Sequence, residues 1–410
     1  MILTVLGGSA QSTPVLVKSL AATAGEREVT VRLAGLNQWR LAAVARASRL
    51  LTVGSRLRIQ EYGSCRWEQA IEGCAAVLIQ IRIGYYQGRH FDETFPLECG
   101  VPGDEGLGPG GLSAAWRAWP WIRRVCRKIQ LIAPQALPVL LSSPVGLLVR
   151  LAAIEFPGWP LTGVCELPFT TLRQVSEITG RSLEAISFDY VGVNHVGFLY
   201  NAESDGEELN LASRGLTGFP SPELIAQLHA FPLKYLRLHY CREEVVTEQR
   251  TRRNTRAREL EVIAGQSFAT FRSGGKDAIE MALRRRRAEW YADAVAPLLR
   301  WRMGEVLDIP LFLTIADGEV KERYFRMHQG GLRPSIPRRE PPSEVADLIG
   351  RFVTYERVAA QAVAEDSEQA LATALAAHPW VKRVGCADVL ARRIVRQFSE
   401  PLCLSYTRRS

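Results

Sequence analysis

The sequence has no apolar run long enough to cross a membrane, although 47% of its 410 residues are hydrophobic. A membrane-spanning helix needs about 20 consecutive apolar residues, and proline or arginine interrupts the longest apolar stretches, 137–141 and 147–154. The N-terminus also lacks a basic leader followed by a small-residue cleavage site. We therefore expect a globular, cytoplasmic protein with no membrane partner.

Paired cysteines and nucleic-acid motifs are also absent. Eight cysteines are spread along the chain without a CxxC pair, which is typical of free thiols rather than of structural disulfides. The formal net charge is +8, and much of the excess lies in arginines between residues 250 and 287, where no zinc-finger spacing or recognisable nucleic-acid motif occurs. These arginines are interpreted as a solvated helix face or an oligomer contact, with an anion site as the alternative. We expect no nucleic-acid partner.

The first part of the chain alternates between strand and helix patterns. We expect strands at 2–6, 29–33, 75–83 and 137–142, and helices at 13–20, 41–51 and 114–132. This alternation indicates an α/β protein with a Rossmann-like, doubly wound sheet. The segment 84–111, which is rich in glycine and proline, is expected to be a long functional loop.

The length of the chain suggests two units. A boundary is expected at the proline- and glycine-containing segment 156–160. Beyond it we expect strands at 187–193 and 312–315, a helix-rich stretch at 221–296 and a mostly helical end at 343–396.

A glycine-containing turn follows the first strand pattern. Gly7, Gly8 and Ser9 precede a helical pattern, and such a turn lets backbone N–H groups approach a pyrophosphate. A carboxylate at the end of the second strand would usually bind the ribose hydroxyls, but residues 34–37 read Ala-Gly-Leu-Asn. The pattern alone does not decide between a dinucleotide site and an ordinary strand-to-helix turn.

Four further segments occur in a characteristic order. They read QIRIG at 80–84, GVPGDEGLGPGG at 100–111, GVCELP at 163–168 and GVNHVGF at 192–198. In this order, and together with the Gly-Gly-Ser turn and HPWV at 378–381, they resemble glycoside hydrolase family 4. The resemblance extends over nearly the whole chain.

The resemblance implies an NAD-binding Rossmann-like domain, residues 1–158, followed by a lactate/malate dehydrogenase-like α+β domain, residues 159–410, for catalysis and oligomerisation. Members of this family use NAD and a divalent metal, and they are an exception to the two-carboxylate rule of glycosidases. The implied reaction oxidises the sugar at C3, removes the proton at C2, eliminates the leaving group at C1, then adds water and returns the hydride. The implied assembly is a homodimer or homotetramer, and the implied substrate is a glycoside, with or without a 6-phosphate.

Cys165 and His195 match the family's two metal ligands, for which Mn²⁺ or another divalent ion is expected. Tyr235 matches the base at C2, with Tyr240 as the alternative, and a phenol needs a nearby cation to act as a base. Glu166 stands at a position that varies with substrate among family members, and we expect it to protonate the leaving group. Without the resemblance, the cysteine, the histidine and the tyrosines would be interpreted as ordinary core residues.

Other matching positions face the cofactor or the sugar in the family. The expected cofactor contacts are Gly7, Gly8, Ser9, Gln80, Arg82 and Glu105, and the expected substrate contacts are Arg89, Asn194 and Ser143. Arg89 corresponds to an arginine that contacts the 6-phosphate in phospho-specific members. The alternative for Arg89 is an ion pair with Asp92 or Glu93.

Three departures from the family keep other functions open. The carboxylate after the second strand is missing, an expected Thr-Asn-Pro reads Ser-Ser-Pro at 142–144, and an expected Arg-Gly-Gly-Ala reads Arg-Arg-Ala-Glu at 286–289. The alternatives are a non-hydrolytic redox or eliminating enzyme of a specialised sugar pathway, and a family member that has lost catalysis and only binds.

Overall fold

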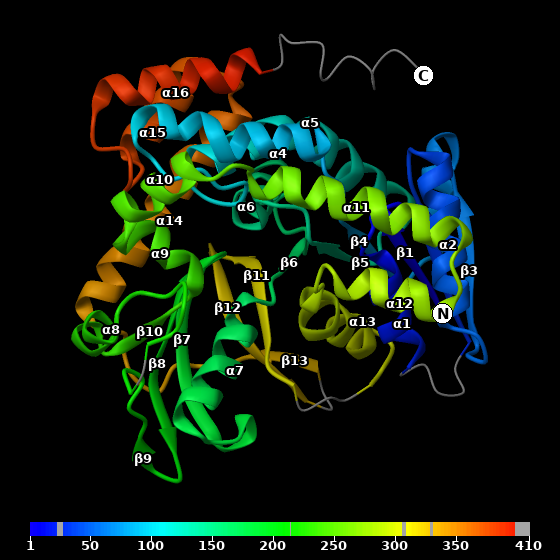
Figure 1. Ribbon diagram of the computed structural model, residues 1–410, viewed down its shortest axis with the longest axis horizontal. Helices are drawn as coiled ribbons and strands as arrows, with labels where there is room; N and C mark the ends of the chain where they lie inside the picture. The colour runs from blue at the N-terminus through cyan, green and yellow to red at the C-terminus, as the bar shows by residue number, and fades with distance from the viewer. Residues whose placement is uncertain (23–27, 214, 306–308, 329–330, 398–410) are drawn as a thin grey trace.

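The computed structural model describes residues 1–22, 28–213, 215–305, 309–328 and 331–397. These residues form one sheet of thirteen strands surrounded by helices (Figure 1). No helix within these ranges is both long and apolar enough to cross a bilayer.

The first half of the sheet is parallel and has the order β3-β2-β1-β4-β5-β6. This is the strand order of doubly wound dinucleotide-binding sheets, so the prediction of a Rossmann-like sheet is confirmed. The strands are β1 (Ile2–Leu6), β2 (Val29–Ala34), β3 (Leu57–Tyr62), β4 (Ala76–Ile79), β5 (Leu137–Leu140) and β6 (Thr162–Val164).

Helices cover both faces of this parallel region, so its central strands are buried on both sides. In β4, Ala76 and Leu78 pack into one hydrophobic core, whereas Val77 and Ile79 pack into another, as the two-residue period of a strand requires. The helices of this half are α1 (Thr13–Ala21), α2 (Gln38–Leu51), α3 (Trp67–Ile71), α4 (Tyr85–Thr94), α5 (Gly108–Ile132) and α6 (Val145–Glu155).

The prediction of a long loop at 84–111 is wrong, because this segment is mostly helical. It contains α4, the short 3₁₀ segment Phe95–Cys99 and the start of α5. Some of its glycines and prolines mark helix ends. Gly84 precedes α4 with a φ of 79°, and Pro109 occupies the first turn of α5, where a proline is tolerated.

The second half of the sheet is antiparallel and continues from the first without a break, because β11 pairs with β6. Its strands are β7 (Ile186–Val193), β8 (Val196–Ser204), β9 (Glu207–Glu208), β10 (Ala230–Pro232), β11 (Leu311–Asp317), β12 (Glu319–His328) and β13 (Gly331–Pro334). The expected strands at 187–193 and 312–315 are confirmed. The division at residue 158 stays a prediction, and β6, which follows it, belongs to the parallel region.

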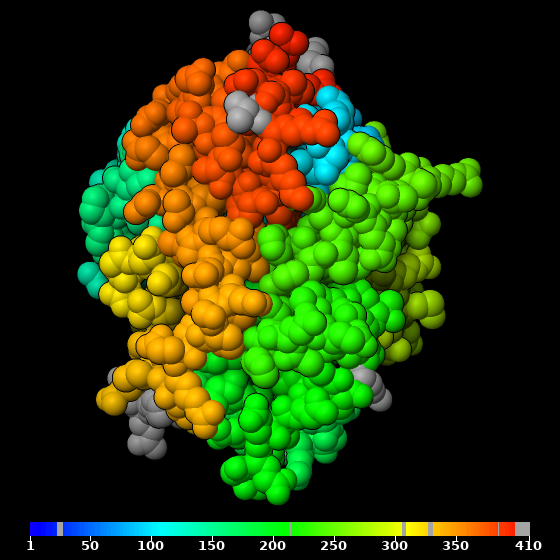
Figure 2. Space-filling view, turned by 90° about the vertical axis from the view of Figure 1, so that its left-hand side faces the viewer, coloured from blue at the N-terminus to red at the C-terminus, as the bar shows by residue number. Residues whose placement is uncertain are grey.

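The helices of the second half return to the first half. Helix α11 contacts α2 and α4, and α14 contacts α5 and α6 (Figure 1). Helices α14 to α16, orange to red in Figure 2, lie beside the green segments that precede α11. The helices of the second half are α7 (Leu167–Thr179), α8 (Pro222–Leu228), α9 (Arg237–Tyr240), α10 (Arg242–Thr251), α11 (Arg256–Ser273), α12 (Lys276–Arg284), α13 (Ala296–Arg302), α14 (Ser343–Ala364), α15 (Glu368–Ala377) and α16 (Val384–Arg396).

Candidate active site

A pocket of about 610 Å³ lies beside the carboxyl ends of β1, β2, β4, β5 and β6, which is where doubly wound sheets bind their ligands. Residues from both halves of the chain line it. Twelve of the thirteen site residues expected from the sequence are among them, namely Gly7, Ser9, Gln80, Arg82, Arg89, Glu105, Ser143, Cys165, Glu166, Asn194, His195 and Tyr235. Gly8 is the exception.

The turn between β1 and α1 has no room for side chains at its two glycines. Gly7 has a φ of 89°, and a Cβ there would lie 2.7 Å from the carbonyl oxygen of Gln80. A Cβ on Gly8 would lie 2.9 Å from the Cα of Leu33. Gly8 therefore lets the turn pack against β2, whereas Gly7 and Ser9 face the pocket. The cradle fits a pyrophosphate at a helix N-terminus.

Gln80 holds this turn in place. Its Nε2 donates to the carbonyl oxygen of Gly7 at 3.2 Å and to Oγ1 of Thr13 at 2.9 Å. Its Oε1 accepts from the hydroxyl of Tyr291 at 2.7 Å. Both polar atoms of the amide are thus used within the protein, and the side chain positions the turn. Sequence reasoning missed Tyr291 as the partner.

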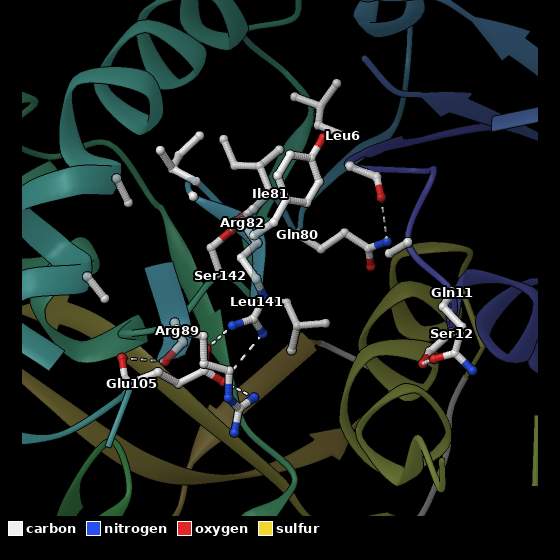
Figure 3. A pocket seen from close by; sticks show the side chains of 18 of the residues that line it. Leu6, Gln11, Ser12, Gln80, Ile81, Arg82, Arg89, Glu105, Leu141 and Ser142 are labelled. Atoms are coloured by element: carbon white, nitrogen blue, oxygen red, sulfur yellow. Dashed lines mark hydrogen bonds and ion pairs between the residues drawn. The ribbon is translucent and has the colours of Figure 1, made fainter. Parts of the chain in front are cut away.

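Two arginines and two glutamates form an ion-pair network at one end of the pocket. Glu105 pairs with Arg82 and, at 2.5 Å, with Arg89, whose Nε also donates to Glu93 at 2.6 Å. Figure 3 shows Glu105, Arg82 and Arg89 together, across the pocket from Gln11 and Ser12. The Arg89–Glu93 pair is the alternative that the sequence left open.

Cys165 lies between the end of β6 and the start of α7, with a buried side chain. Its sulfur accepts a hydrogen bond from the backbone N–H of Leu167 at 3.4 Å. Burial, followed by the carboxylates of Glu166 and Glu322, raises the pKa of the thiol well above its ordinary value. A bound cation would reverse this shift, because metal ligation deprotonates a thiol.

His195 lies in the turn between β7 and β8, with a φ of 69°. Its Nδ1 is buried and has no hydrogen-bond partner among the described residues. The ring stacks on Tyr235, with centroids 4.6 Å apart and planes 5° from parallel. Burial lowers the pKa of the imidazole to about 4, so the ring is neutral at neutral pH, which is the form that binds metals.

Asn194 is held by a buried carboxyl group. Its Nδ2 donates to Oε1 of Glu322 at 3.2 Å, and the hydroxyl of Tyr190 donates to Oε2 at 2.5 Å. Ser143 also lines the pocket, and its hydroxyl donates to the carbonyl oxygen of Glu105 at 3.4 Å. These hydrogen bonds fix the position of Asn194 and thereby that of its neighbour His195.

The residues present fit a divalent metal with open coordination positions. No group of three or more His, Cys, Asp or Glu side chains with metal-binding geometry occurs in the described part of the chain. Cys165 and His195 nevertheless line one pocket, and a buried thiol together with a buried imidazole whose Nδ1 has no partner is a ligand set that suits a first-row divalent ion. Two protein ligands would leave positions for substrate hydroxyls or water.

Tyr235 reaches the pocket, whereas Tyr240 does not line it. Burial, followed by the charge of Asp104, raises the pKa of the Tyr235 phenol, and Arg89 opposes this shift. Glu166, at the N-cap of α7, also lines the pocket, and burial raises the pKa of its carboxyl group.

Several arginines of the pocket were not expected from the sequence. Arg40 on α2 is one, and Arg256, Arg286 and Arg287 come from the basic stretch that was interpreted mainly as a solvated face. In the same stretch, Arg284 and Arg285 are exposed and do not line the pocket. The alternative interpretation of the basic stretch, an anion site, therefore fits part of it. The departure from the family at 286–289 was the sequence signal that could have located this part.

Two family models match the chain. The model described as "Family 4 glycosyl hydrolase" matches residues 2–181, and the one described as "Family 4 glycosyl hydrolase C-terminal domain" matches residues 190–381. The chain belongs to glycosyl hydrolase family 4. The family resemblance expected from the sequence is confirmed.

Curated relatives of this family 4 chain are named as phosphoglucosidases. A probable 6-phospho-beta-glucosidase of Bacillus subtilis (strain 168) is 24% identical over 358 residues, which are 81% of this chain and 80% of the relative. A 6-phospho-beta-glucosidase of Thermotoga maritima is 26% identical over 311 residues, which are 73% of each chain.

Solved structures have the same fold as this family 4 chain. The Thermotoga maritima 6-phospho-beta-glucosidase with manganese, NAD⁺ and glucose-6-phosphate has a TM-score of 0.84 and 23% identity, over 97% of this chain and 98% of the other. A malate dehydrogenase of Plasmodium falciparum has a TM-score of 0.51 and 12% identity, over 88% of this chain and 98% of the other. The expectation of a lactate/malate dehydrogenase-like fold is confirmed.

Proposed function

We propose that this protein is a glycosidase that depends on a nicotinamide dinucleotide and on Mn²⁺ or another divalent metal. One observation carries the proposal: Cys165, His195 and Tyr235 line the same pocket as the glycine turn that follows β1. The names of the relatives support a glycosidase. Solved relatives that contain NAD and manganese support the two cofactors.

When bound, the dinucleotide would supply reversible oxidation of the sugar at C3, and the metal would supply positive charge that stabilises negative charge developing on the sugar. The chain's own residues have distinct tasks. The turn at Gly7 and Ser9 binds the pyrophosphate, and Cys165 with His195 holds the metal. Tyr235 removes the proton from C2, and Glu166 gives a proton to the departing oxygen at C1. Water then adds at C1, so that the net reaction is hydrolysis.

We propose a 6-phosphorylated glycoside as the substrate class, because the charge of the pocket suits an anion. Three carboxylates line it, against eight arginines, namely Arg40, Arg82, Arg89, Arg117, Arg124, Arg256, Arg286 and Arg287. An arginine guanidinium forms paired hydrogen bonds with a phosphate. The cytoplasmic location and the homodimeric or homotetrameric assembly stay predictions.

The test is a panel of 4-nitrophenyl glycosides, plain and 6-phosphorylated and in both anomers, assayed with Mn²⁺ and with NAD⁺ or NADP⁺. We expect nitrophenol release that requires both the metal and a dinucleotide. Removal of the base should lower kcat of Tyr235→Phe by about 10²- to 10⁴-fold, whereas Tyr240→Phe, the matched control outside the pocket, should keep its activity. Release that needs no dinucleotide, or equal effects of the two variants, would contradict the proposal.

A further inference from the structure

The end of β2 has no room for the carboxylate that usually binds ribose hydroxyls. Gly35 lines the pocket, and a Cβ at this position would lie 2.9 Å from Oγ and 3.3 Å from the backbone nitrogen of Ser9. The hydroxymethyl group of the pyrophosphate turn thus occupies the place where a side chain of residue 35 would begin. The packing of the turn against β2 therefore excludes a carboxylate side chain at residue 35.

Asn37 does not supply the missing acceptor. Its Oδ1 accepts a hydrogen bond from the backbone N–H of Arg40 at 3.0 Å and caps α2. The side chain is neutral and committed to the helix. Leu36, which lies between Gly35 and Asn37, has an apolar and exposed side chain. The segment from 34 to 37 therefore presents no negative charge to the adenosine end of the pocket.

Arg40, whose side chain is positively charged, lines the pocket from the first turn of α2. The guanidinium of Arg40 lies 5.2 Å from the ring centroid of Phe268 and 5.7 Å from that of Tyr85, and both rings also line the pocket. These contacts hold the side chain against the pocket wall. Arg40 has no ion-pair partner among the carboxylates of the described residues, so its charge is available to a ligand.

In doubly wound sheets, the charge beside the end of β2 decides which dinucleotide is accepted. A carboxylate there binds the ribose 2′-hydroxyl of NAD, whereas a nearby arginine accommodates the 2′-phosphate of NADP. Here the carboxylate that would repel a phosphate is absent, and an arginine without a carboxylate partner is present.

We infer that the dinucleotide of this protein is the 2′-phosphorylated form, NADP⁺ or NADPH, and that Arg40 is the residue that selects it. This inference rests on the proposed function and specifies its cofactor. It also explains why a chain that keeps the Gly-Gly-Ser turn lacks a ribose-binding carboxylate.

The experiment is a calorimetric titration of the full-length protein, in the presence of Mn²⁺, with NAD⁺, NADP⁺ and the probe pair ADP and adenosine 2′,5′-bisphosphate. We expect NADP⁺ to bind at least tenfold more tightly than NAD⁺, and the 2′,5′-bisphosphate to bind more tightly than ADP. The probe pair reports recognition of the 2′-phosphate without any catalysis or substitution.

The variants Arg40→Ala and Arg40→Gln should lose at least tenfold in affinity for NADP⁺ and stay within twofold for NAD⁺. Arg49→Ala is the matched control, because Arg49 lies on the same helix, pairs with Glu61 at 2.7 Å and does not line the pocket. Equal or tighter binding of NAD⁺, or equal losses for both dinucleotides at residue 40, would overturn this inference alone. If neither dinucleotide binds at millimolar concentration, the proposed function fails with it.

Discussion

At the scale of single residues, buried carboxyl groups make the stability of this protein depend on pH. Glu356 on α14 is 6% exposed, and its Oε2 has no hydrogen-bond partner among the described residues and lies 3.8 Å from NH2 of Arg150. Burial raises the pKa of this carboxyl group to about 7, although Arg150 opposes the shift. The folded protein therefore holds a proton that the unfolded chain, with a glutamate pKa near 4.3, releases at lower pH.

The free energy of unfolding should consequently fall as the pH rises from 5 to 8, because the unfolded state binds fewer protons over this range. The side chain of residue 356 cannot ionise in Glu356→Gln, so the free energy of unfolding of this variant should fall by about 2 kcal/mol less over the same pH range. Urea unfolding at both pH values measures the difference, with the exposed Glu365→Gln at the end of the same helix as control. An unchanged fall in Glu356→Gln would refute this assignment.

The sequence segments predicted the pocket residues well, because most of these segments lie at or just after the end of a strand. The partners of those residues were harder to predict. Gln80 meets Tyr291 across 211 positions of the chain, and Asn194 meets Glu322 across 128. No local pattern specifies such pairs, since packing of the whole chain brings them together. The ion pair of Arg89 with Glu93 was foreseeable, because four positions on a helix place the two side chains side by side.

At the scale of elements, strong patterns were predicted and weak ones were missed. Strands β1 and β2 and helix α1 lie within one residue of the expected bounds. Strand β6 has only three residues, and β3, at the edge of the sheet, is half exposed, so neither shows a clear apolar period. The expected strand at 75–83 ends at Ile79 because the following residues leave the sheet and line the pocket.

The turn between β1 and α1 permits a controlled test of close backbone approach. Gly7→Ala adds a Cβ at 2.7 Å from the carbonyl oxygen of Gln80, whereas Gly54→Ala, at a similar φ of 86°, meets nothing within 4 Å. Both variants carry the strain of a positive φ, about 1 kcal/mol. Gly7→Ala should lose about 2 kcal/mol more in urea unfolding and should lose dinucleotide affinity, which Gly54→Ala keeps. Equal behaviour of the two variants would show that the turn tolerates a side chain.

At the scale of the whole molecule, the two halves share a hydrophobic core. The core beside α1 and α2 contains Leu3 and Val31 from the parallel sheet together with Phe271, Ile279 and Leu298 from α11, α12 and α13. The sequence predicted two consecutive units, but it could not show that helices from 256–302 return to cover the first sheet. Such a return depends on contacts between distant segments and leaves no local pattern.

A fragment of residues 1–181 should therefore fail to fold cooperatively, although it contains all six parallel strands. Without α11 to α13, one face of its sheet would expose apolar side chains to water. The expected results are strong binding of a hydrophobic dye and no sharp transition in urea, in contrast to a cooperative transition for the full chain. A sharp transition of the fragment would show that the first half is an independent domain.

The most direct test of the account is whether the sulfur of Cys165 binds the metal. Co²⁺ can replace other first-row ions, and a thiolate ligand gives it an intense charge-transfer absorption band in the near ultraviolet. We predict this band in the wild-type protein and in Cys65→Ser, whose cysteine is exposed, and its loss in Cys165→Ser. No band in the wild type, or a band that persists in Cys165→Ser, would contradict the proposed metal site and the mechanism that depends on it.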